Sequence, residues 1–588
     1  MKKTRIFFYI LLFLVLGISV SWSQSGNVGP RGNFYDDPSD GIYVSPSGND
    51  VTATGSIDAP FKSINTALNA ALNSSLSSAT IILRGGTYQE KRDVRVRMSN
   101  VTIKSAKGEW AVIDLTIYDP GNDQHSGVLF YAKDEKTGGI VKDCKLQCVE
   151  VKGGFYTVCF ETTWEWGEAY PDRKGASNII VEDCILHHST DDAVKVKPGC
   201  EHITIRYNEI HNSGQRHAHL PDFNTGEHNA EGIDNVNGDG MHVHNNYIHD
   251  ICSTGIYAKG GATNVIIENN IIEQAYAGGI MLGFDTSPQY FDIILNPEYY
   301  ENINGIARNN LIINAGWEGI GLYASKDAQI YNNTIINAVS GPLNYHSPIY
   351  FGVATQDWEN FEGCPPNINP NIHNNIVYQP STYYNRMIDI RFVKDFYDPV
   401  LYPGLLNFDL SSLDGNPTMD YNCYFNAGKS ATFTDNRPPA VTNMELLAWK
   451  EHINNENNSI EIDPNFDNNY MPSNSQCAGM GILYPLIINE PIGMSESYMN
   501  QNIMVYPNPT SGKFSVISFQ LSDVSSEMSV VSIEILDFAG RIVHREPCPV
   551  NRVPFSVNRA TVEIDISHLP AGIYFVKVGK EIVKVVKK

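Results

Sequence analysis

Basic residues are scarce in this sequence: 42 Lys and Arg stand against 65 Asp and Glu, which gives a formal net charge of −23. A surface this acidic repels phosphate backbones and so excludes a general nucleic-acid binder. An anionic polysaccharide remains compatible with it, provided that a local basic cleft meets the polymer. Hydrophobic residues make up 42% and charged residues 18% of the chain, which excludes a disordered protein.

Long apolar runs are absent except near the N-terminus, which excludes a polytopic membrane protein. The chain begins Met-Lys-Lys-Thr-Arg, continues with an apolar stretch over 6–20, and then has Ser21, Trp22 and Ser23. The stretch is shorter than the ~20 residues that span a bilayer, so a membrane anchor is the less favoured alternative. The pattern predicts a secretory signal peptide over residues 1–23.

Closely spaced cysteine pairs are also missing. None of the ten cysteines forms the CxxC spacing of a zinc site, and only Cys144 and Cys148 are near each other. Disulfides are allowed in an exported chain, and Cys144 and Cys184 share a position in the repeat described next, where they could stack or bridge. We expect mostly structural thiols, with a connectivity that the sequence leaves open.

A short repeat runs through the middle of the chain: an apolar residue, two polar residues, Asn or Cys, any residue, and an apolar residue. It occurs at 141–146, 181–186, 205–210, 243–248, 267–272, 307–312, 330–335 and 372–377. Intervals of 24, 24 and 23 residues separate Cys184 from Asn208, Asn246 from Asn270, and Asn310 from Asn333. Alternating apolar residues and Gly or Asn turns within each unit indicate short strands. The pattern predicts an all-β, right-handed parallel β-helix with a ladder of stacked asparagines.

The segment 59–72 has Phe61, Ile64, Leu68, Ala71 and Leu72 on one helical face, which predicts an amphipathic helix that caps the solenoid. The region 42–88 contains YVSPSGND, GSIDAPFKSINTAL and IILRGGTY. It resembles the start of secreted pectate-lyase-like β-helix proteins, and the resemblance continues through the repeats to about residue 480. It implies a polysaccharide lyase type of protein, with the β-helix as a catalytic domain over 24–485.

The C-terminal region differs in composition from the repeats. After a linker over 486–503, it contains MVYPNPTSGKFSV, IEILDFAGR and ISHLPAGIYFVKV. Alternating strands with turn dipeptides predict a small β-sandwich over 504–588. These motifs resemble the C-terminal sorting domain of the type IX secretion system. The resemblance implies export by that machinery, to the cell surface or the medium, and no catalytic role for this domain.

Counting eleven residues from a ladder position gives Lys195, Tyr257, Met281 and Gly321. The rung of Asn208 carries an inserted loop, and the matching strand after that loop places Asp234 at the same position. We expect these side chains in one outward column. Lys197, Lys259 and Tyr323 follow two positions along. Because rungs stack about 4.8 Å apart, Asp234 should lie beside both Lys195 and Tyr257. Two positions before the column stand small residues, which should leave an open floor for a sugar chain: Ala193, Gly232, Gly255, Gly279 and Gly319.

The loop over 212–230 carries Arg216, His217 and His219, and ten of the sixteen histidines lie between His187 and His249. Elimination on a uronic acid needs a base for the C5 proton, a cation at the carboxylate and an acid at the leaving oxygen. The expected catalytic residues are Lys195, Tyr257, Lys259, His217 and His219. The expected substrate-binding residues are Lys197, Arg216, Asp234 and Tyr323. Asp191, Asp192 and Asp234 are candidate ligands for Ca²⁺, and no cofactor is required by the pattern.

The strand that begins Thr190-Asp-Asp resembles two families in part. Calcium-dependent pectate lyases have a third Asp where this chain has Lys195. Polygalacturonase-type hydrolases share the Asp pair, but their Gly-His-Gly and Arg-Ile-Lys motifs are missing here, as is the Asp-Pro-His motif of uronate epimerases. We therefore expect a monomeric lyase that acts on uronic-acid polymers. The alternatives are an oligosaccharide dehydratase, an epimerase, a hydrolase, or a glycan-binding solenoid that uses Trp164, Trp166, Trp317 and Trp358.

Overall fold

The computed structural model describes residues 26–489 except 91, 116–124, 166–172, 343–344, 355–363, 381–383 and 393–410. It also describes 503–506, 513–519, 531–536, 542–548, 559–570, 572–578 and 581–587. The chain divides into two compact units, Met1–Glu490 and Pro491–Lys588, which are described separately. The predicted signal peptide lies outside the described residues. Within the described part, no helix has the length and apolar character needed to cross a membrane.

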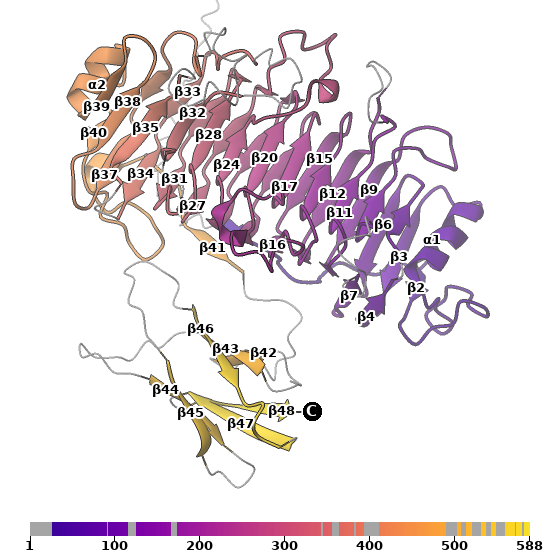
Figure 1. The fold of residues 1–588 in the computed structure, drawn as a ribbon. Helices are drawn as coiled ribbons and strands as arrows, with labels where there is room; N and C mark the ends of the chain where they lie inside the picture. Colours follow the sequence, from indigo (N-terminus) through magenta and orange to yellow (C-terminus); the bar gives the residue numbers. More distant parts are fainter. Residues whose placement is uncertain are drawn as a thin grey trace, which may run out of the picture. The chain divides into compact units, whose positions relative to one another are not determined.

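The first unit is a parallel β-helix made of three twelve-stranded sheets (Figure 1). Sheet I contains β2 (Ile42–Val44), β3 (Ala79–Leu83), β6 (Val101–Ser105), β9 (Lys142–Gln147), β12 (Ser177–Glu182), β15 (Glu201–Arg206), β18 (His242–His244), β22 (Ile266–Glu268), β26 (Ile306–Arg308), β30 (Gln329–Tyr331), β33 (Asn371–His373) and β36 (Thr418–Asp420). Sheet II contains β4 (Gly86–Gln89), β7 (Ala111–Asp114), β10 (Val149–Lys152), β13 (Ile185–His187), β16 (Glu209–His211), β19 (Tyr247–Ile251), β23 (Ile271–Ala275), β27 (Leu311–Ile313), β31 (Thr334–Ile336), β34 (Ile376–Gln379), β37 (Cys423–Asn426) and β40 (Ile460–Glu461). Sheet III contains β5 (Val94–Val96), β8 (Val128–Phe130), β11 (Val158–Phe160), β14 (Val194–Val196), β17 (Ile233–Val236), β20 (Ile256–Lys259), β24 (Ile280–Leu282), β28 (Ile320–Tyr323), β32 (Ile349–Gly352), β35 (Arg386–Ile390), β38 (Thr432–Asp435) and β39 (Val441–Met444). Neighbouring strands are parallel except for β38 and β39.

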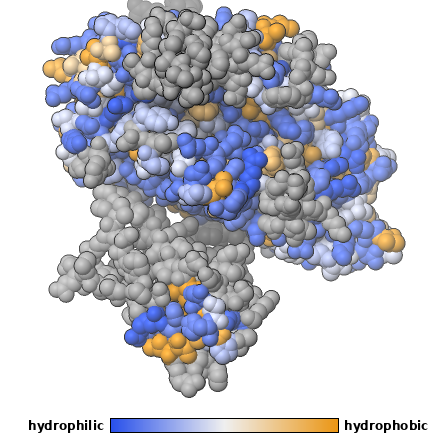
Figure 2. All heavy atoms as spheres, viewed as in Figure 1, coloured by the Kyte–Doolittle hydropathy of each residue, from blue (hydrophilic) through white to orange (hydrophobic). Residues whose placement is uncertain are grey.

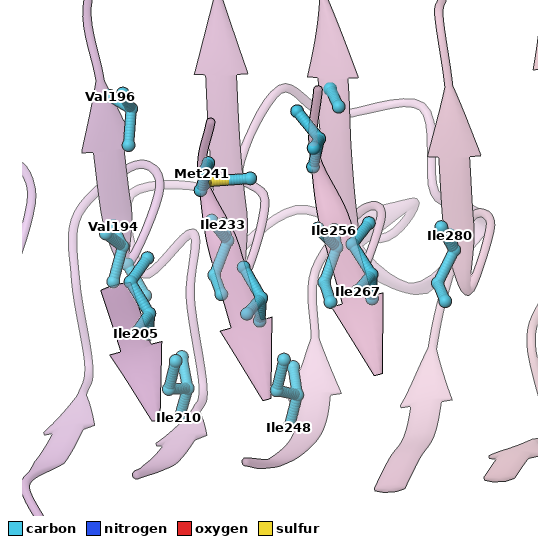
Figure 3. Close-up of a cluster of buried hydrophobic side chains, with 14 of the residues drawn as sticks. Val194, Val196, Ile205, Ile210, Ile233, Met241, Ile248, Ile256, Ile267 and Ile280 are labelled. Carbon is cyan, nitrogen blue, oxygen red and sulfur yellow. The ribbon is translucent and has the colours of Figure 1, made fainter. Parts of the chain in front are cut away.

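The interior is filled by stacked aliphatic side chains, because each rung repeats the apolar pattern of the one before. Val194, Ile233, Ile256 and Ile280 of successive rungs lie in one row, opposite residues of the other two sheets such as Ile248 (Figure 3). The coloured part of the β-helix surface in Figure 2 is largely hydrophilic. This division between inside and outside is what fixes the outward direction of the residues discussed below.

Helices close both ends of the solenoid. α1 (Ile64–Asn73) buries Ile64, Ala67, Leu68 and Ala71 against the first rungs, which confirms the predicted cap. α2 (Leu446–Ile453) packs on β38 and β39 at the other end and buries Trp449. A short β1 (Gly26–Val28) pairs with β41 (Leu486–Ile488), so the two ends of the described first unit lie side by side on the flank of the β-helix.

Further short strands and 3₁₀ turns lie outside the three large sheets. They are the sheet β21 (Ala262–Thr263), β25 (Asn302–Ile303) and β29 (Ser325–Lys326), and the 3₁₀ turns η1 (Phe223–Thr225), η2 (Pro288–Tyr290) and η5 (Ser475–Cys477).

The predicted asparagine ladder is confirmed at the turn between sheets I and II. The Asn246 carboxamide oxygen accepts from the backbone N–H and the side-chain amide of Asn208, both at 3.0 Å. The same pair of bonds, at 2.9–3.1 Å, repeats from Asn246 to Asn270, Asn310, Asn333, Asn375 and Asn422. Each buried carboxamide thereby satisfies backbone groups of the neighbouring rung.

Replacing one ladder residue should therefore destabilise the β-helix. In Asn270→Ala, the Asn246 amide loses its acceptor and the Val243 carbonyl loses its donor. We expect the free energy of unfolding to fall by about 2–3 kcal/mol, because an unsatisfied buried group costs ~1–3 kcal/mol. Urea unfolding followed by circular dichroism measures the effect. The exposed Asn468→Ala is the control, and an equal effect of both changes would contradict the prediction.

The nine cysteines whose side chains the structure describes are buried and unbridged. Cys144 and Cys184 each donate to a backbone carbonyl, of Met98 and Leu146, and do not pair with each other. Cys423 and Cys477 lie closest together, with their sulfurs 3.6 Å apart. These contacts are those of structural thiols.

The second unit consists of two antiparallel sheets. One contains β42 (Ile503–Tyr506), β43 (Lys513–Phe519) and β46 (Arg559–Asp565), and the other contains β45 (Ile542–Cys548), β44 (Val531–Leu536), β47 (Gly572–Val578) and β48 (Glu581–Lys587). Ile533, Ile535, Ile564, Ile566 and Val576 are buried between the strands. This is the small β-sandwich that the alternating pattern predicts.

Candidate active site

The outward column on sheet III has the register that the repeat predicts. Lys195 on β14 pairs with Asp234 on β17, Asp234 with Tyr257 on β20, Tyr257 with Met281, and Met281 with Gly321. The stacking of rungs thus brings together side chains 39 and 23 residues apart in the sequence. A polar cluster forms where the column starts.

Lys195 lies between two buried carboxylates. Its ammonium is 3.1 Å from Asp192 Oδ2 and in direct contact with Asp234 Oδ2. Burial alone would lower the pKa of Lys195, but the charges of Asp192 and Asp234 outweigh burial and raise this pKa well above its usual value. Lys195 is therefore a fixed cation. Because a lysine held by two carboxylates keeps its proton, the catalytic role expected of Lys195 is compatible with a cation and not with a base.

Glu231 belongs to the same cluster and was not identified from the sequence. It precedes Asp234 by three residues, as Asp192 precedes Lys195, so the repeat register could have found it. Its backbone N–H donates to Asp192 Oδ1 at 3.0 Å, and its carboxyl accepts from Ser253 Oγ at 3.2 Å. Burial, followed by the negative charge of Asp192, raises the pKa of Glu231 well above its usual value. The raised pKa favours the protonated form of Glu231.

These residues do not fit a Ca²⁺ site. Oxygens of Asp192, Glu231 and Asp234 lie within 4.8 Å of one another, but the Lys195 ammonium already occupies the space beside two of them. Asp191, which we expected as a ligand, is turned to Arg216 instead. Ca²⁺ takes six to eight oxygen ligands. The sequence alone did not indicate that a lysine would supply the positive charge beside these carboxylates.

Asp191 is the carboxylate best suited to proton transfer. Burial and the nearby charge of Asp192 raise its pKa to about 7, while Arg216 opposes the shift from 3.0 Å away. The pKa of Asp192 is lowered instead, because Lys195 and the Glu231 N–H outweigh its burial. Two adjacent carboxylates therefore differ in pKa. In enzymes such a difference commonly separates the group that acts as the acid from the group that acts as the base.

The loop over 212–230 is anchored on the turn that holds Asp191. The N–H of Gly214 donates to the Asp191 carbonyl at 3.0 Å, and Arg216 Nε donates to His217 Nε2 at 2.9 Å. Burial and the charge of His228 lower the pKa of His217 to about 4, so its imidazole is neutral. The His217 ring stacks on His228, with centroids 4.3 Å apart. His219 is exposed on the loop.

Tyr257 and Lys259 follow on β20, and both side chains are buried. Lys259 Nζ lies 4.5 Å from the Tyr257 ring centroid, and Phe284 stacks on Tyr257 with the ring centroids 5.3 Å apart. Burial raises the pKa of Tyr257 well above its usual value, so its hydroxyl is a proton donor and not a base. Tyr323, expected to bind substrate, donates to Glu318 Oε1 at 2.8 Å in the buried layer below.

Lys197, expected to bind substrate, is paired with Glu161 at 2.7 Å. The small residues before the column do not form an open floor, because a Cβ on Gly232 would lie 2.5 Å from the Gly255 carbonyl oxygen, and one on Gly255 would lie 2.6 Å from that of Gly279. Glycine is needed there for close stacking of the rungs.

The fold and this outward face define the class of protein: a right-handed parallel β-helix. The family model of the right handed beta helix region matches residues 99–349 and 231–384. The model of the secretion system C-terminal sorting domain matches residues 504–588. The chain thus carries a right-handed parallel β-helix followed by a sorting domain, which directs the protein through type IX secretion to the cell surface or the medium.

Several solved structures are similar to the chain. Pectate lyase Pel9A is 14% identical and covers 60% of this chain and 78% of its own, with a TM-score of 0.37. An alginate lyase from a Paenibacillus strain is 14% identical and covers 63% and 95%, with a TM-score of 0.36. The A-module of a mannuronan C-5 epimerase from Azotobacter vinelandii is 11% identical and covers 63% and 92%, with a TM-score of 0.38. No curated protein matches the chain in sequence.

Proposed function

We propose that the protein is a secreted enzyme that cleaves uronic-acid-containing polysaccharides or oligosaccharides by β-elimination on the outward face of sheet III. The observation that carries this proposal is Asp191, a carboxylate with a pKa of about 7 that is paired with Arg216 and followed in the chain by Asp192, which accepts from the Glu231 N–H. A base near neutrality, a cation and a proton donor are the three groups that elimination needs.

In this proposal, Asp191 takes the C5 proton of a uronate. Arg216 and Lys259 bind the carboxylate and stabilise the charge that develops on it. The C5–H electrons form the C4–C5 double bond as the C4–O bond breaks, and Glu231 gives its proton to the leaving oxygen. Lys195 contacts both Asp192 and Asp234 and so holds the cluster in place. The product is an unsaturated uronate at the new non-reducing end.

Hydrolysis by paired acids is less well supported. Retaining glycosidases hold two carboxyl groups about 5–5.5 Å apart and inverting ones about 6.5–9.5 Å apart. Asp192, Glu231 and Asp234 have oxygens within 4.8 Å, with Lys195 beside them. A glycan-binding solenoid is also less well supported, because Trp317 is buried and donates to the Thr225 carbonyl at 3.1 Å. Trp166 and Trp358 lie outside the described residues.

The test is the formation of a conjugated enoate, which absorbs at about 235 nm, on a panel of uronate polymers and oligomers. We expect absorbance to rise with at least one anionic substrate and not with neutral glycans. A dehydratase would give the same chromophore without shortening the chain, which mass spectrometry distinguishes. An epimerase would exchange the C5 proton for deuterium without any absorbance. Binding with neither signal, across the panel, would refute an enzyme of this kind.

A further inference from the structure

Three histidines form a stack on the outer face of sheet II, away from the sheet that carries the candidate active site. His187 on β13 pairs with His211 on β16, and His211 pairs with His249 on β19. The ring centroids are 4.8 Å apart at both steps, with interplanar angles of 14° and 9°. The stack therefore follows the rung spacing of the β-helix over three consecutive coils.

Each ring is oriented by the residue that follows it in the chain. Asn212 and Asp250 have left-handed backbone conformations, with φ of 53° and 51°, and these turn their side chains back toward the preceding histidine. His211 Nδ1 lies 2.7 Å from Asn212 Oδ1, and His249 Nδ1 lies 2.8 Å from Asp250 Oδ2. An oxygen acceptor at Nδ1 holds the proton on that nitrogen, which leaves Nε2 as the coordinating atom.

A carboxylate faces the free side of the rings. Glu209 is two residues before His211 on the same strand, and its Oε1 lies 3.2 Å from His249 Nε2. One oxygen of Glu209 and one ring nitrogen each of His211 and His249 lie within 4.8 Å of one another. Two ligands that each lie ~2.0–2.1 Å from one tetrahedral ion are separated by roughly 3.3 Å. Glu209 and His249 already have this separation, and a tilt of the His211 ring would bring in the third ligand.

We propose that Glu209, His211 and His249 bind a divalent transition-metal ion of the zinc class, with Asp250 and Asn212 as the outer groups that orient the two imidazoles. Two imidazole nitrogens and one carboxylate oxygen are a ligand set for zinc and its neighbours, whereas Ca²⁺ prefers oxygen ligands only. The ion would join adjacent coils of the solenoid. It would therefore stabilise the folded β-helix by an amount that grows with the logarithm of the free metal concentration once the site is largely occupied.

The test uses the full chain without a polyhistidine tag, treated with a chelator and then titrated with Zn²⁺ by isothermal titration calorimetry. We expect saturable binding that His211→Gln and His249→Gln each weaken by more than ~100-fold. Loss of an outer-shell partner costs ~10–100-fold in metal affinity, so Asp250→Ala should fall in that range. Zn²⁺ should also raise the melting temperature of the wild type and leave that of the two glutamine variants unchanged.

His373→Gln is the matched control. His373 also lies on an outward strand, and its Nδ1 faces the oxygen of the following Asn374 at 3.3 Å, but it stacks on Tyr331 and not on a second histidine. The His373→Gln variant should bind Zn²⁺ with the same affinity as the wild type. Equal affinity in the wild type, His211→Gln and His249→Gln would overturn the proposal. If the variants do not fold, electron paramagnetic resonance of Cu²⁺ bound to the wild type tests the site instead. We expect coupling to two imidazole nitrogens, and a spectrum without nitrogen coupling would refute the site.

Discussion

Asp191→Asn should lower kcat/KM for elimination by about 10²–10⁴-fold, the usual loss when a positioned acid or base is removed. Asparagine has nearly the same size and can still accept from Arg216 but cannot take a proton. The steady-state rate of unsaturated product formation measures the effect on the substrate that the panel identifies. Asp58→Asn, at an exposed carboxylate outside the site, should leave the rate unchanged.

The pH dependence gives a second readout for the same residue. A base works in its deprotonated form, and Asp191 has a pKa of about 7, so wild-type kcat/KM should rise as the pH increases through about 7. In Asp191→Asn, this limb should disappear from the residual rate. A variant that keeps the full rate, or a profile with the same limb, would contradict the assignment of Asp191 as the base.

Lys195→Met should lower the free energy of unfolding by about 3–5 kcal/mol at pH 7, because removing one partner of a buried ion pair leaves the other charge uncompensated. Here the carboxylates of Asp192 and Asp234 would lose their cation, and both of these side chains are almost fully buried. Urea unfolding followed by circular dichroism measures the loss. Lys145→Met, at an exposed strand position of sheet I, is the control and should change stability by less than ~0.5 kcal/mol.

The pH and a second substitution separate this effect from a simple loss of packing. Without Lys195, the buried carboxylates can be neutralised by protonation, so the difference between variant and wild type should shrink as the pH falls. Lys195→Met combined with Asp234→Leu should recover part of the loss, because it removes one of the unpaired charges. A pH-independent difference, or no recovery in the double variant, would show that the ion pairs do not stabilise the cluster.

The β-helix could be predicted from the sequence because stacked coils come from consecutive stretches of the chain. Every coil repeats the same backbone path, so an interval of about 24 residues in the sequence becomes one step between stacked rungs. The asparagine ladder, the inward aliphatic rows and the column of Lys195, Asp234 and Tyr257 all follow from that interval once the loops inserted in the longer coils are set aside. The cap helix was predictable from its own apolar face, since Ile64, Leu68 and Ala71 recur at helical spacing.

The chemistry of the site depended on tertiary structure. The sequence alone placed Lys195 and Asp234 in one column, but the contacts that make Lys195 a fixed cation come from side-chain packing between rungs. The pKa of Asp191 is raised by burial and by the charge of Asp192, and it is lowered in part by Arg216, which the loop over 212–230 brings to it. The glycines expected to form an open floor are instead closed by carbonyl groups of the next coil. Periodicity in a sequence therefore fixes which residues stack, whereas burial and the distances between charged atoms, which decide proton affinity, arise only when coils and loops are packed together.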